Sequence, residues 1–476
     1  MRKTKIICTM GPATEGRCEE LILNGMDAAR FNFSHENYEI HGRRIRELKE
    51  ARERLKVPVA MIIDTKGPEM RIGVLKKKFD LKKDTRIRLV VEDIEGDENA
   101  VSITNKMLYE KVRPGQSIFI DDGRIELAVI EIIGTDIVCS VISGGPLSSR
   151  KGVNVPDCDT GLPFMTEKDI QDIEFGIEND FDYVALSFVH SAADIYKVRG
   201  ILKKKYREDI KIIAKIENRE AVNNIDEIIE AADSIMIARG DMGIELPLSQ
   251  VPVIQKRLIK KCYSSAKPVI VATQMLESMT ENPLPTRAEV SDVANAIYDG
   301  TSVVMLSGET AAGDFPIKSL QTMARVVEDT EADIDYESRF AIENFDMIEK
   351  NALNIISKAA VMTAFEIKAK AIVMPTRTGN SARMVSSFRP STPIIAITMK
   401  PTIQRQLNMS WNIRPMLSEF IGDQKQLFEN VMNKACETKL VEEDDQVIMI
   451  AGIPTGSSGK TNMMKIHKVG EAVVGD

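Results

Sequence analysis

Eight short apolar stretches, each five to seven residues long, recur along the first two-thirds of the chain. Most are followed by an amphipathic stretch of helical length, such as residues 41–55, 192–205 and 251–265. Short runs rich in Ile, Val and Ala are typical of parallel strands that are buried on both faces. Eight alternating β and α units predict a TIM (β/α)8 barrel, with a doubly wound open sheet as the alternative. The predicted strands are Lys5–Thr9, Ala28–Ser34, Val59–Thr65, Tyr183–Val189, Lys211–Glu217, Ser234–Arg239, Pro268–Thr273 and Ser302–Ser307.

A segment of different character lies between the third and fourth predicted strands. From Gly67 to Gly152 apolar and polar residues alternate, and turn signals occur at Asp122-Gly123 and Gly144-Gly145. This pattern is typical of antiparallel strands joined by tight turns. We therefore predict an inserted all-β domain at residues 68–162, between two parts of the barrel domain at residues 1–67 and 163–331. The clearest alternating runs are residues 86–91, 117–120 and 126–130.

The pattern of strands and helices restarts after about Glu331. Two helical stretches, 351–367 and 424–438, alternate with apolar runs that are typical of strands. The segment that begins at Val469 has the pattern of a final strand. This alternation predicts a separate C-terminal α/β domain at residues 332–476. The predicted strands before Val469 are Ala371–Pro375, Pro393–Thr398 and Gln446–Ile450.

Composition narrows the class of protein. The 476 residues carry 63 Lys and Arg against 71 Asp and Glu, for a net charge of −8, which argues against nucleic acid or an anionic membrane as the main partner. No apolar run reaches the length of a membrane span, and the apolar stretch near the N-terminus is too short for a secretory signal. The six cysteines are scattered without a CxxC pair, which disfavours disulfides and zinc sites. We expect a cytoplasmic enzyme.

Polar and charged residues collect at the carboxyl ends of the predicted barrel strands, where TIM barrels hold their catalytic groups. Because side chains alternate along a strand, residues two apart share a face. Arg30, Asn32 and Ser34 should therefore line up, as should Lys215 with Glu217 and Arg239 with Asp241. One such charge is usually solvated or part of a structural ion pair, but seven strand ends of this kind favour a site. The full set is Arg30, Asn32, Ser34, Asp64, Thr65, Ser187, Lys215, Glu217, Arg239, Asp241, Thr273, Ser307 and Glu309.

The types of residue in this set indicate the chemistry. Glu217 and Asp241 are two carboxylates on adjacent predicted strands, and one or two carboxylates are the usual protein ligands of Mg²⁺. Arg30 and Lys215 suit a phosphate or an anionic transition state. The chain has only four histidines and no Ser-His-Asp or Cys-His arrangement. These residues predict a metal-assisted enzyme that acts on a phosphorylated or carboxylated substrate.

The same residues lie in stretches that strongly resemble the pyruvate kinases. Several of the stretches are long, they occur in the order of that family, and they cover the barrel and the insert, which makes the resemblance specific. The C-terminal part resembles the family more loosely. The stretches are Thr4–Ala13, Ala29–His35, Asp64–Arg71, Lys151–Pro156, Ala214–Asn218, Ala238–Gly243, Ala272–Met279, Pro285–Glu289 and Met305–Ala311.

The resemblance implies a barrel domain, a mobile β lid inserted after the third strand, and an α/β effector domain. It implies transfer of a phosphoryl group from phosphoenolpyruvate to ADP, which gives pyruvate and ATP in the last step of glycolysis, with Mg²⁺ (or Mn²⁺) and K⁺ as cofactors. It also implies a homotetramer, in which the segment Pro285–Glu289 opens a helix at a subunit contact and Arg287 reaches the neighbouring subunit.

The resemblance also implies a role for each matching residue. Arg30, Lys215 and Thr273 form the catalytic set: the two cations bind the moving phosphoryl group and Thr273 supports protonation of the enolate. The other implied roles are Mg²⁺ ligands (Glu217, Asp241), K⁺ ligands (Asn32, Ser34, Asp64 and the Thr65 carbonyl), substrate contacts (Gly240, Asp241, Ser187, Phe188) and nucleotide contacts (His35, Arg71, Asp122, Lys151).

Three positions bear on how the chain compares with other members of the family. Glu69 is a residue that accompanies dependence on K⁺, whereas members that do not need K⁺ carry Lys there. His190 stands where many members have Arg, and Ile72 stands where Thr is common. We expect little consequence from the last two.

A phosphate-effector site is predicted in the C-terminal domain. The loop after the strand Ala371–Pro375 is rich in hydroxyl groups and precedes a helix, which suits a phosphate group. The loop 452–461 ends another strand and could close over it. Two polar surface loops without a ligand are the alternative. The proposed residues are Thr376, Arg377, Thr378, Gly379, Asn380, Ser381, Lys460 and Thr461, with a sugar phosphate or AMP as the ligand.

Three other functions fit parts of the sequence. A Schiff-base aldolase on the same barrel would use Lys215 as its nucleophile. A P-loop nucleotide binder would use Pro454–Thr461, which nearly matches GxxxxGK[ST] but has Pro454 in place of the first Gly. A non-catalytic sensor would keep only the role of the effector domain, which the intact set of residues at the strand ends disfavours.

Overall fold

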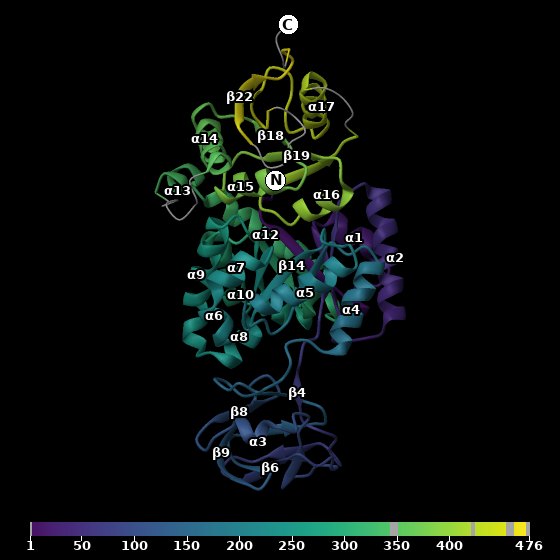
Figure 1. Cartoon of the computed structure of the whole chain (residues 1–476), viewed down its shortest axis with the longest axis vertical. Coiled ribbons are helices and arrows are strands. Elements are labelled where there is room, and N and C mark those ends of the chain that lie inside the picture. The colour runs from purple at the N-terminus through teal and green to yellow at the C-terminus, as the bar shows by residue number, and fades with distance from the viewer. Residues whose placement is uncertain (1, 343–350, 420–423, 454–460, 473–476) are drawn as a thin grey trace.

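The structure is a computed structural model that describes residues 2–342, 351–419, 424–453 and 461–472. Three parts follow one another along its long axis (Figure 1). The helix-coated barrel lies in the middle, the inserted all-β domain projects from one end, and the C-terminal α/β domain covers the other end. Among the described residues, no helix combines the length and the apolar character needed to cross a membrane.

The central sheet is a closed barrel of eight parallel strands. The sheet closes on itself because its first strand pairs with both the second and the last strand. Lys5 lies opposite Val303 in one pair and Ile7 opposite Ala28 in the other. The predicted TIM barrel is therefore confirmed and the doubly wound open sheet is wrong. In spatial order the strands are β1 (Lys5–Met10), β17 (Val303–Leu306), β16 (Val269–Ala272), β15 (Ser234–Ala238), β14 (Lys211–Ile216), β13 (Tyr183–Leu186), β3 (Ala60–Asp64) and β2 (Ala28–Asn32).

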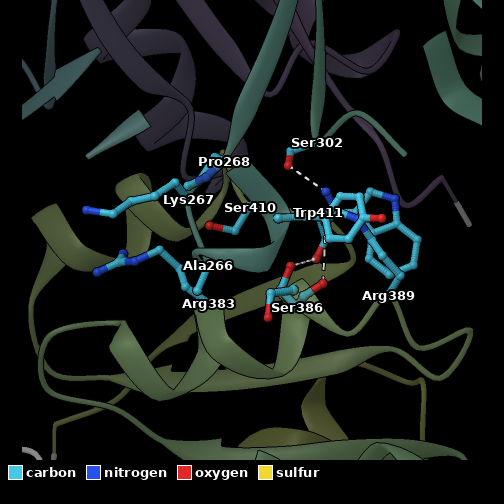
Figure 2. Close-up of a pocket in the computed structure, with 11 residues that line it drawn as sticks. Ala266, Lys267, Pro268, Ser302, Arg383, Ser386, Arg389, Ser410 and Trp411 are labelled. Atoms are coloured by element: carbon cyan, nitrogen blue, oxygen red, sulfur yellow. Dashed lines mark hydrogen bonds between the residues drawn. The ribbon is translucent and has the colours of Figure 1, made fainter. Parts of the chain in front are cut away.

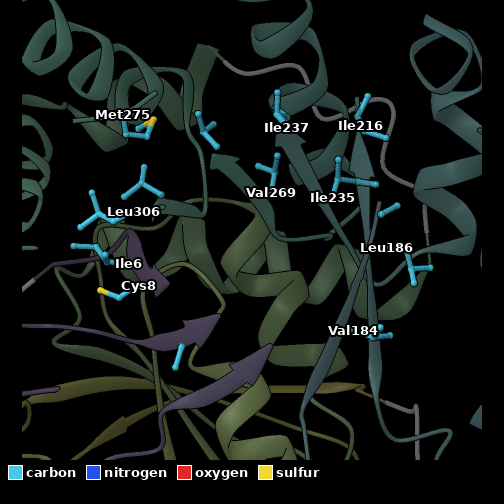
Figure 3. Packing of buried hydrophobic residues seen from close by; sticks show 14 of the residues in the cluster. Ile6, Cys8, Val184, Leu186, Ile216, Ile235, Ile237, Val269, Met275 and Leu306 are labelled. Atoms are coloured by element: carbon cyan, nitrogen blue, oxygen red, sulfur yellow. The ribbon is translucent and has the colours of Figure 1, made fainter. Parts of the chain in front are cut away.

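The alternation of side chains divides the apolar residues of these strands into two cores. Ile6, Cys8 and Ile235 point outward into the layer between strands and helices (Figure 3). Ile7 and Ile213, of the other parity, fill the inside of the barrel. Both layers are almost completely buried, which explains why the strands read as continuous apolar runs.

Helices surround the barrel, and local signals set their ends. At the start of α10, the Thr286 hydroxyl accepts from the Glu289 amide and the Glu289 carboxylate accepts from the Thr286 amide. Gly300 ends the helix with a φ of 93°. The predicted helices 41–55, 192–205 and 251–265 are confirmed as α2, α5 and α9. The helices of this part are α1 (Cys18–Leu23), α2 (Tyr38–Leu55), α4 (Glu167–Glu178), α5 (Ala192–Lys204), α6 (Arg219–Asn223), α7 (Ile225–Ala231), α8 (Arg239–Glu245), α9 (Val251–Ser264), α10 (Arg287–Asp299), α11 (Gly308–Ala311) and α12 (Pro316–Asp333). The next helix, α13 (Tyr336–Ile342), lies beside the C-terminal domain, where its Phe340 packs against the core (Figure 1).

The insert is an all-β domain with its own core, as the alternating pattern predicts. The Asp122-Gly123 turn is confirmed as the hairpin between β8 and β9. The turn expected at Gly144-Gly145 is wrong: Gly145 begins a strand, and Gly144 packs so closely that a Cβ there would lie 2.1 Å from the Leu81 carbonyl oxygen. The elements are β4 (Met70–Arg71), β5 (Phe79–Leu81), β6 (Arg86–Val90), β7 (Ala100–Ser102), α3 (Leu108–Lys111), β8 (Ser117–Ile120), β9 (Ile125–Ile133), β10 (Asp136–Ser143), β11 (Gly145–Leu147) and β12 (Gly152–Asn154).

The C-terminal domain is a five-stranded sheet in the order β20-β19-β18-β21-β22, parallel except for β22. The expected final strand at Val469 is misplaced. The last strand is β22, which pairs in register with β21 from Met463 to Lys468, and Val469 already lies in the turn beyond it. The elements are α14 (Ala352–Glu366), β18 (Ala371–Pro375), α15 (Asn380–Ser387), β19 (Ile394–Thr398), α16 (Pro401–Leu407), β20 (Ile413–Leu417), α17 (Gln424–Glu437), β21 (Gln446–Ala451) and β22 (Met463–Lys468).

The α/β domain closes the amino-terminal end of the barrel. Met409 joins the apolar core inside the barrel, and the Tyr183 hydroxyl donates to the Gln406 carbonyl at 2.8 Å. Arg405 forms an ion pair with the buried Asp182 at 2.8 Å. Burial raises the pKa of Asp182 to about 6, although Arg405 opposes that rise. The carboxyl end of the barrel is therefore the end that faces the inserted domain.

Candidate active site

The inward-facing positions of four neighbouring strands change from apolar to polar toward the carboxyl end of the barrel. Tyr183 and Ala185 lie in the interior core, so the same face continues to Ser187. In β14 the interior face continues in the same way from Ile213 to Lys215. In β2 it continues from Ala28 to Arg30, and in β3 from Ile62 to Asp64. The expected alignment of residues two apart is thus confirmed for Lys215 with Glu217 and for Arg30 with Asn32. It does not extend to Ser34, because β2 ends at Asn32 and Ser34 lies in the turn that follows.

Asp64 lies at the centre of this polar end and is only 1% exposed. It accepts from Arg30 Nε at 2.6 Å and lies 3.2 Å from Lys215 Nζ. Burial acts to raise the pKa of Asp64, but the charges of Lys215 and Arg30 outweigh it and hold the pKa below its ordinary value. Arg30 also donates to the Thr9 hydroxyl at 3.0 Å, so its guanidinium is fixed from two sides.

Lys215 is held by three groups. Its Nζ lies 2.9 Å from Glu217 Oε1 and donates to Ser187 Oγ at 2.6 Å, in addition to its contact with Asp64. Ser187 in turn donates to the Thr65 carbonyl at 2.7 Å. Burial acts to lower the pKa of Lys215, but Asp64 and Glu217 outweigh it and raise the pKa above its usual range. Lys215 therefore stays a cation, which disfavours a Schiff-base nucleophile.

Glu217 and Asp241 form a pair of carboxylates next to this cation. Burial, reinforced by the negative charge of Glu217, raises the pKa of Asp241 to about 7. Glu217 Oε2 accepts from the Phe188 amide at 2.6 Å, where Phe188 has a φ of 53°. The two carboxylates, that of Glu217 buried and that of Asp241 half-buried, repel each other and suit a divalent cation, since Mg²⁺ commonly takes one or two carboxylates from a protein. Among the described residues, no group of three or more His, Cys, Asp or Glu is placed to hold a metal.

Four residues that could hold a monovalent cation meet at the ends of β2 and β3. Asn32 lies opposite Asp64 in the strand register, and its side-chain oxygen accepts from the Ser34 amide at 3.1 Å. The Thr65 amide donates to the Ala185 carbonyl at 3.0 Å. These residues offer carboxylate, amide, hydroxyl and carbonyl oxygens at the ends of two neighbouring strands, although the Asp64 carboxylate and the Thr65 carbonyl already contact Arg30, Lys215 and Ser187.

Thr273 and Gly240 come together at the ends of β16 and β15. The Gly240 amide donates to Thr273 Oγ1 at 2.8 Å, and Thr273 Oγ1 donates to the Ala272 carbonyl at 2.6 Å. Thr273 has a φ of 65°, a backbone conformation that is costly for a β-branched residue. The strained backbone therefore holds the Thr273 hydroxyl against the amide of Gly240, the residue that precedes Asp241.

The inserted domain brings Arg71, Lys151 and Asp122 toward this end of the barrel. Arg71 lies opposite Gly152 in the β4–β12 pair and donates to Glu69 through Nε at 2.9 Å and to the Arg150 carbonyl at 2.7 Å. Lys151 Nζ pairs with Asp121 at 2.7 Å, a partner that sequence reasoning missed. The β8–β9 turn, which carries Asp122, lies beside α8, since a Cβ on Gly123 would lie 4.0 Å from Ile244 Cγ1. The charge of Asp122 also contributes to the raised pKa of Asp241.

Two family models match the chain. One describes the barrel domain of pyruvate kinase and matches residues 1–320, and the other describes its alpha/beta domain and matches residues 354–467. The chain belongs to the pyruvate kinase family. Its catalytic class is therefore that of a phosphotransferase.

Curated and structural relatives agree with this assignment. A pyruvate kinase of Clostridium acetobutylicum is 46% identical over 98% of this chain and 100% of its own length. One from Sporosarcina psychrophila is 44% identical over 99% of this chain and 81% of its own length. A crystal structure of a pyruvate kinase from Cryptosporidium parvum superposes with a TM-score of 0.92 at 38% identity, covering 98% of this chain and 96% of that one.

Not every charged strand end of this pyruvate kinase chain faces the site. The expectation that Arg239 aligns with Asp241 is wrong, because β15 ends at Ala238 and Arg239 begins α8. Arg239 instead pairs with Asp292 at 2.6 Å and donates to the Thr273 carbonyl. Glu309 is also structural, since its carboxylate accepts the amides of Ser307 and Leu276 at 2.7 and 3.0 Å.

Contacts between the inserted domain and the barrel were missed at the sequence level. Asn154 donates to Glu245 of α8 at 3.3 Å, and Asp157 pairs with Arg219 of α6. The only signal in the sequence for these contacts was that Asn154 lies inside the stretch Lys151–Pro156, which resembles the family.

His35, one of the expected nucleotide contacts, is exposed after β2, and its carbonyl accepts from His41 Nε2 at 2.9 Å.

The two departures from the family pattern have local partners. His190 Nδ1 lies 3.7 Å from Asp194 Oδ2, and its interaction with this carboxylate raises the pKa of His190. Ile72 is buried in the core of the inserted domain and forms a β-bridge with Ile103.

The loop expected to bind an effector joins β18 to α15. The Gly379 amide donates to Thr376 Oγ1 at 3.0 Å, and Gly379 adopts a φ of 83° just before the helix. Arg377 and Thr378 are exposed. Lys460 lies outside the described residues, as does most of the P-loop-like segment. That segment is followed by the strand β22 rather than a helix, so a P-loop is excluded by its context.

Proposed function

We propose that this chain transfers the phosphoryl group of phosphoenolpyruvate to ADP and gives pyruvate and ATP, as the last step of glycolysis. The observation that carries the proposal is the setting of Lys215, a permanent cation between Asp64, Glu217 and Ser187 at the end of the barrel that faces the inserted domain. Phosphoryl transfer asks mainly for positioning and charge neutralisation, which such a cation provides.

Lys215 and Arg30 bind the phosphoryl group on its way from the enol oxygen to ADP. Both side chains are fixed by carboxylates on the interior face, so they neutralise developing charge without having to reorganise. In this step the bond between phosphorus and the enol oxygen breaks, and a bond to the terminal phosphate oxygen of ADP forms. The product left behind is the enolate of pyruvate.

Thr273 supports the second step, in which carbon 3 of the enolate gains a proton. Its hydroxyl is held by the Gly240 amide and the Ala272 carbonyl. A water on the Thr273 side delivers the proton, and Ser187 and Phe188 shape the pocket for the organic part of the substrate. The hydroxyl orients that water rather than acting as a strong acid.

Glu217 and Asp241 would hold Mg²⁺ or Mn²⁺, and the raised pKa of Asp241 supports a place for a cation between them. When bound there, a divalent ion would supply positive charge to an anionic substrate. Asn32, Ser34, Asp64 and the Thr65 carbonyl would hold K⁺, and their meeting at two adjacent strand ends supports this.

His35, Arg71, Asp122 and Lys151 would face the nucleotide. The contact of Asn154 with Glu245 supports a lid that rests on the barrel when it closes. Closure would exclude water and prevent hydrolysis of the phosphoryl group.

Regulation, assembly and location belong to the same proposal. A sugar phosphate or AMP would bind residues 376–381 together with Lys460 and Thr461, which the hydroxyl-lined turn before α15 supports. The chain would assemble as a homotetramer through the start of α10, where Arg287 and Leu284 are exposed. It would work in the cytoplasm, with neither nucleic acid nor membrane as a partner.

The proposal is tested by following phosphorus NMR signals of phosphoenolpyruvate and ADP incubated with the full chain. We expect the signals of ATP to grow as that of phosphoenolpyruvate falls, in the presence of Mg²⁺ and K⁺, and EDTA to stop the exchange. Release of inorganic phosphate without ATP would contradict the proposal. Trapping of a substrate on Lys215 by borohydride would favour the aldolase instead.

A further inference from the structure

A short turn joins the second strand of the barrel to the helix that follows it. This β2–α2 turn consists of residues 33–37, between the end of β2 at Asn32 and the start of α2 at Tyr38. It carries Ser34 and His35, which the function proposed above assigns to K⁺ and to the nucleotide. The groups that fix this turn therefore fix two of the predicted ligand contacts.

His41 reaches back from α2 to the turn. Its Nε2 lies 2.9 Å from the His35 carbonyl, and its ring stacks on that of Phe33 with the centroids 4.2 Å apart. His41 is 2% exposed, and burial lowers its pKa, so the imidazole is uncharged at neutral pH and carries one proton. A carbonyl can only accept, which places that proton on Nε2. The buried Nδ1, which has no hydrogen-bond partner among the described residues, agrees with this tautomer.

Arg44 holds the same turn through Glu36. Its guanidinium binds both carboxylate oxygens of Glu36, with Nη2 2.9 Å from Oε1. Glu36 has a φ of 67°, a left-handed conformation that is unfavourable for a residue with a Cβ. Arg44 is 2% exposed and also lies 3.5 Å from Glu15. The bidentate ion pair thus compensates an unfavourable backbone conformation in the turn.

We propose that His41 and Arg44 are positioning residues that hold the β2–α2 turn in its ligand-binding conformation. The turn then presents Ser34 to K⁺ and His35 to the nucleotide. His41 acts through its hydrogen bond to the backbone of the turn, and Arg44 acts through its pair with Glu36. This inference rests on the proposed function, because that function assigns the two ligands.

The cations that would bind phosphoenolpyruvate are held in a different way. Arg30 and Lys215 are both fixed by Asp64 on the interior face of the barrel strands. A looser β2–α2 turn should therefore weaken the binding of ADP and K⁺ much more than that of phosphoenolpyruvate. This split distinguishes a positioning role from a general loss of stability, which would affect all three ligands.

The experiment measures ADP binding to the full chain by isothermal titration calorimetry with Mg²⁺ and saturating K⁺. His41→Phe keeps an aromatic ring on Phe33 but loses the donor, and we expect it to bind ADP about three- to tenfold more weakly. In pyruvate formation it should need correspondingly more K⁺, while the Michaelis constant for phosphoenolpyruvate at saturating K⁺ stays within about twofold. His41→Gln should bind ADP within about twofold of the wild type, because its amide can donate to the same carbonyl.

Arg44→Met tests the second contact. Without the ion pair, Glu36 should leave its left-handed conformation, and the ADP affinity should fall severalfold. Adding Glu36→Gly should restore the affinity to within about twofold of the wild type, because glycine adopts a positive φ at little cost. The contact of Arg44 with Glu15 stays lost in this double variant, so the recovery reports on the turn alone.

Ser386→Ala is the matched control. The Ser386 hydroxyl is buried in the α/β domain and donates to the Trp411 carbonyl at 2.6 Å (Figure 2). Its loss, like that of His41 Nε2, removes one buried hydrogen bond to a carbonyl, but in another domain. Ser386→Ala should bind ADP like the wild type.

The inference is overturned if His41→Phe binds ADP like the wild type, or if His41→Gln binds it as weakly as His41→Phe. It is also overturned if Ser386→Ala lowers the ADP affinity as much as His41→Phe does. Should His41→Phe fail to give the circular dichroism of a folded chain, Arg44→Met and its double variant decide, and equal ADP affinities of these two overturn the inference. Calorimetry needs no turnover, so a chain that shows the expected ADP affinities but forms no pyruvate would refute the proposed function alone.

Discussion

Lys215 illustrates how the site is built from single residues. It continues the interior face of β14 beyond Ile213, and its surroundings fix both its place and its charge. Strand periodicity was enough to predict that Lys215 and Glu217 share a face. It could not predict the hydrogen bond to Ser187, which comes from a neighbouring strand 28 residues away.

We expect Lys215→Met to lower turnover by at least about 10²–10³-fold, because it removes the cation that neutralises the transferring group. Steady-state pyruvate formation measures the loss, and circular dichroism checks the fold. Lys211→Met is the matched control on the same strand, since Lys211 pairs with Asp233 away from the site. Turnover near that of the wild type in Lys215→Met would rule out its catalytic role.

Glu217→Gln and Asp241→Asn should each weaken the binding of a divalent cation by about tenfold or more, because each removes one of two ligands. Mn²⁺ binding followed by electron paramagnetic resonance measures this without any turnover. Glu174→Gln serves as the control, because Glu174 pairs with Lys205 at the surface. Unchanged Mn²⁺ affinity in both site variants would remove the metal assignment.

Glu69 is the residue from which we predict a requirement for K⁺. Its carboxylate pairs with Arg71 and lies 3.6 Å from Lys66, in the segment that follows Thr65. A missing positive charge about 4 Å away is worth roughly 4 kcal/mol at an effective dielectric constant near 20, and K⁺ would supply it.

Glu69→Lys should therefore relieve the requirement for K⁺, because the new ammonium takes the place of the ion. The ratio of pyruvate formation in K⁺ to that in tetramethylammonium is the measurement, with Li⁺ expected to activate little. Glu69→Gln is the control, since it breaks the pair with Arg71 but adds no cation. A ratio that stays as high in Glu69→Lys as in the wild type would contradict the prediction.

At the level of elements, the eight barrel strands were predictable because they are buried on both faces and carry the apolar runs that burial requires. Errors occurred where backbone geometry mattered more than polarity. The sequence placed Arg239 on the same strand face as Asp241, but β15 ends one residue before Arg239. Nothing in the sequence indicates the strained φ of Thr273. This conformation accompanies a hydrogen bond from the amide of Gly240, which follows a different strand.

The packing of α16 against the barrel leads to a pH-dependent prediction. Asp182 has a pKa of about 6 in the folded chain, above its ordinary value of 3.8. The stabilisation linked to its protonated form is therefore complete below about pH 4 and is lost as the pH rises through 6. Arg405 offsets this loss by pairing with the ionised carboxylate.

Arg405→Met should accordingly lower the free energy of unfolding by about 3 kcal/mol at pH 8, where the buried carboxylate would be left unpaired. At pH 5 the loss should be much smaller, because Asp182 then takes up a proton. Urea unfolding at both pH values measures the difference. Arg54→Met, which removes an exposed pair with Glu19, is the control; equal losses for Arg405→Met at both pH values would contradict the account.

At the scale of the whole molecule, the division into barrel, insert and α/β domain followed from changes in periodicity along the chain. The relative placement of these parts did not, because it depends on contacts between distant residues. Asn154 meets Glu245 across 91 positions, and Tyr183 meets Gln406 across 223. Spacing alone gives no information about such pairs.

The exposed start of α10 carries the prediction about assembly. Leu284 is 67% exposed in the single chain and lies beside the exposed Arg287, where a homotetramer would form a subunit contact. We expect sedimentation velocity to give a tetramer at micromolar concentration and Arg287→Glu to weaken it. A monomer at that concentration in the wild type would contradict the proposed assembly.

We propose that the cations and carboxylates at the carboxyl end of the barrel support transfer of a phosphoryl group from phosphoenolpyruvate to ADP. The most direct test is a coupled assay of pyruvate formation by the full chain with Mg²⁺, in buffer that contains either K⁺ or tetramethylammonium. We expect rapid pyruvate formation that needs phosphoenolpyruvate, ADP and K⁺ together. No pyruvate under these conditions, or equal rates when ADP is left out, would contradict it.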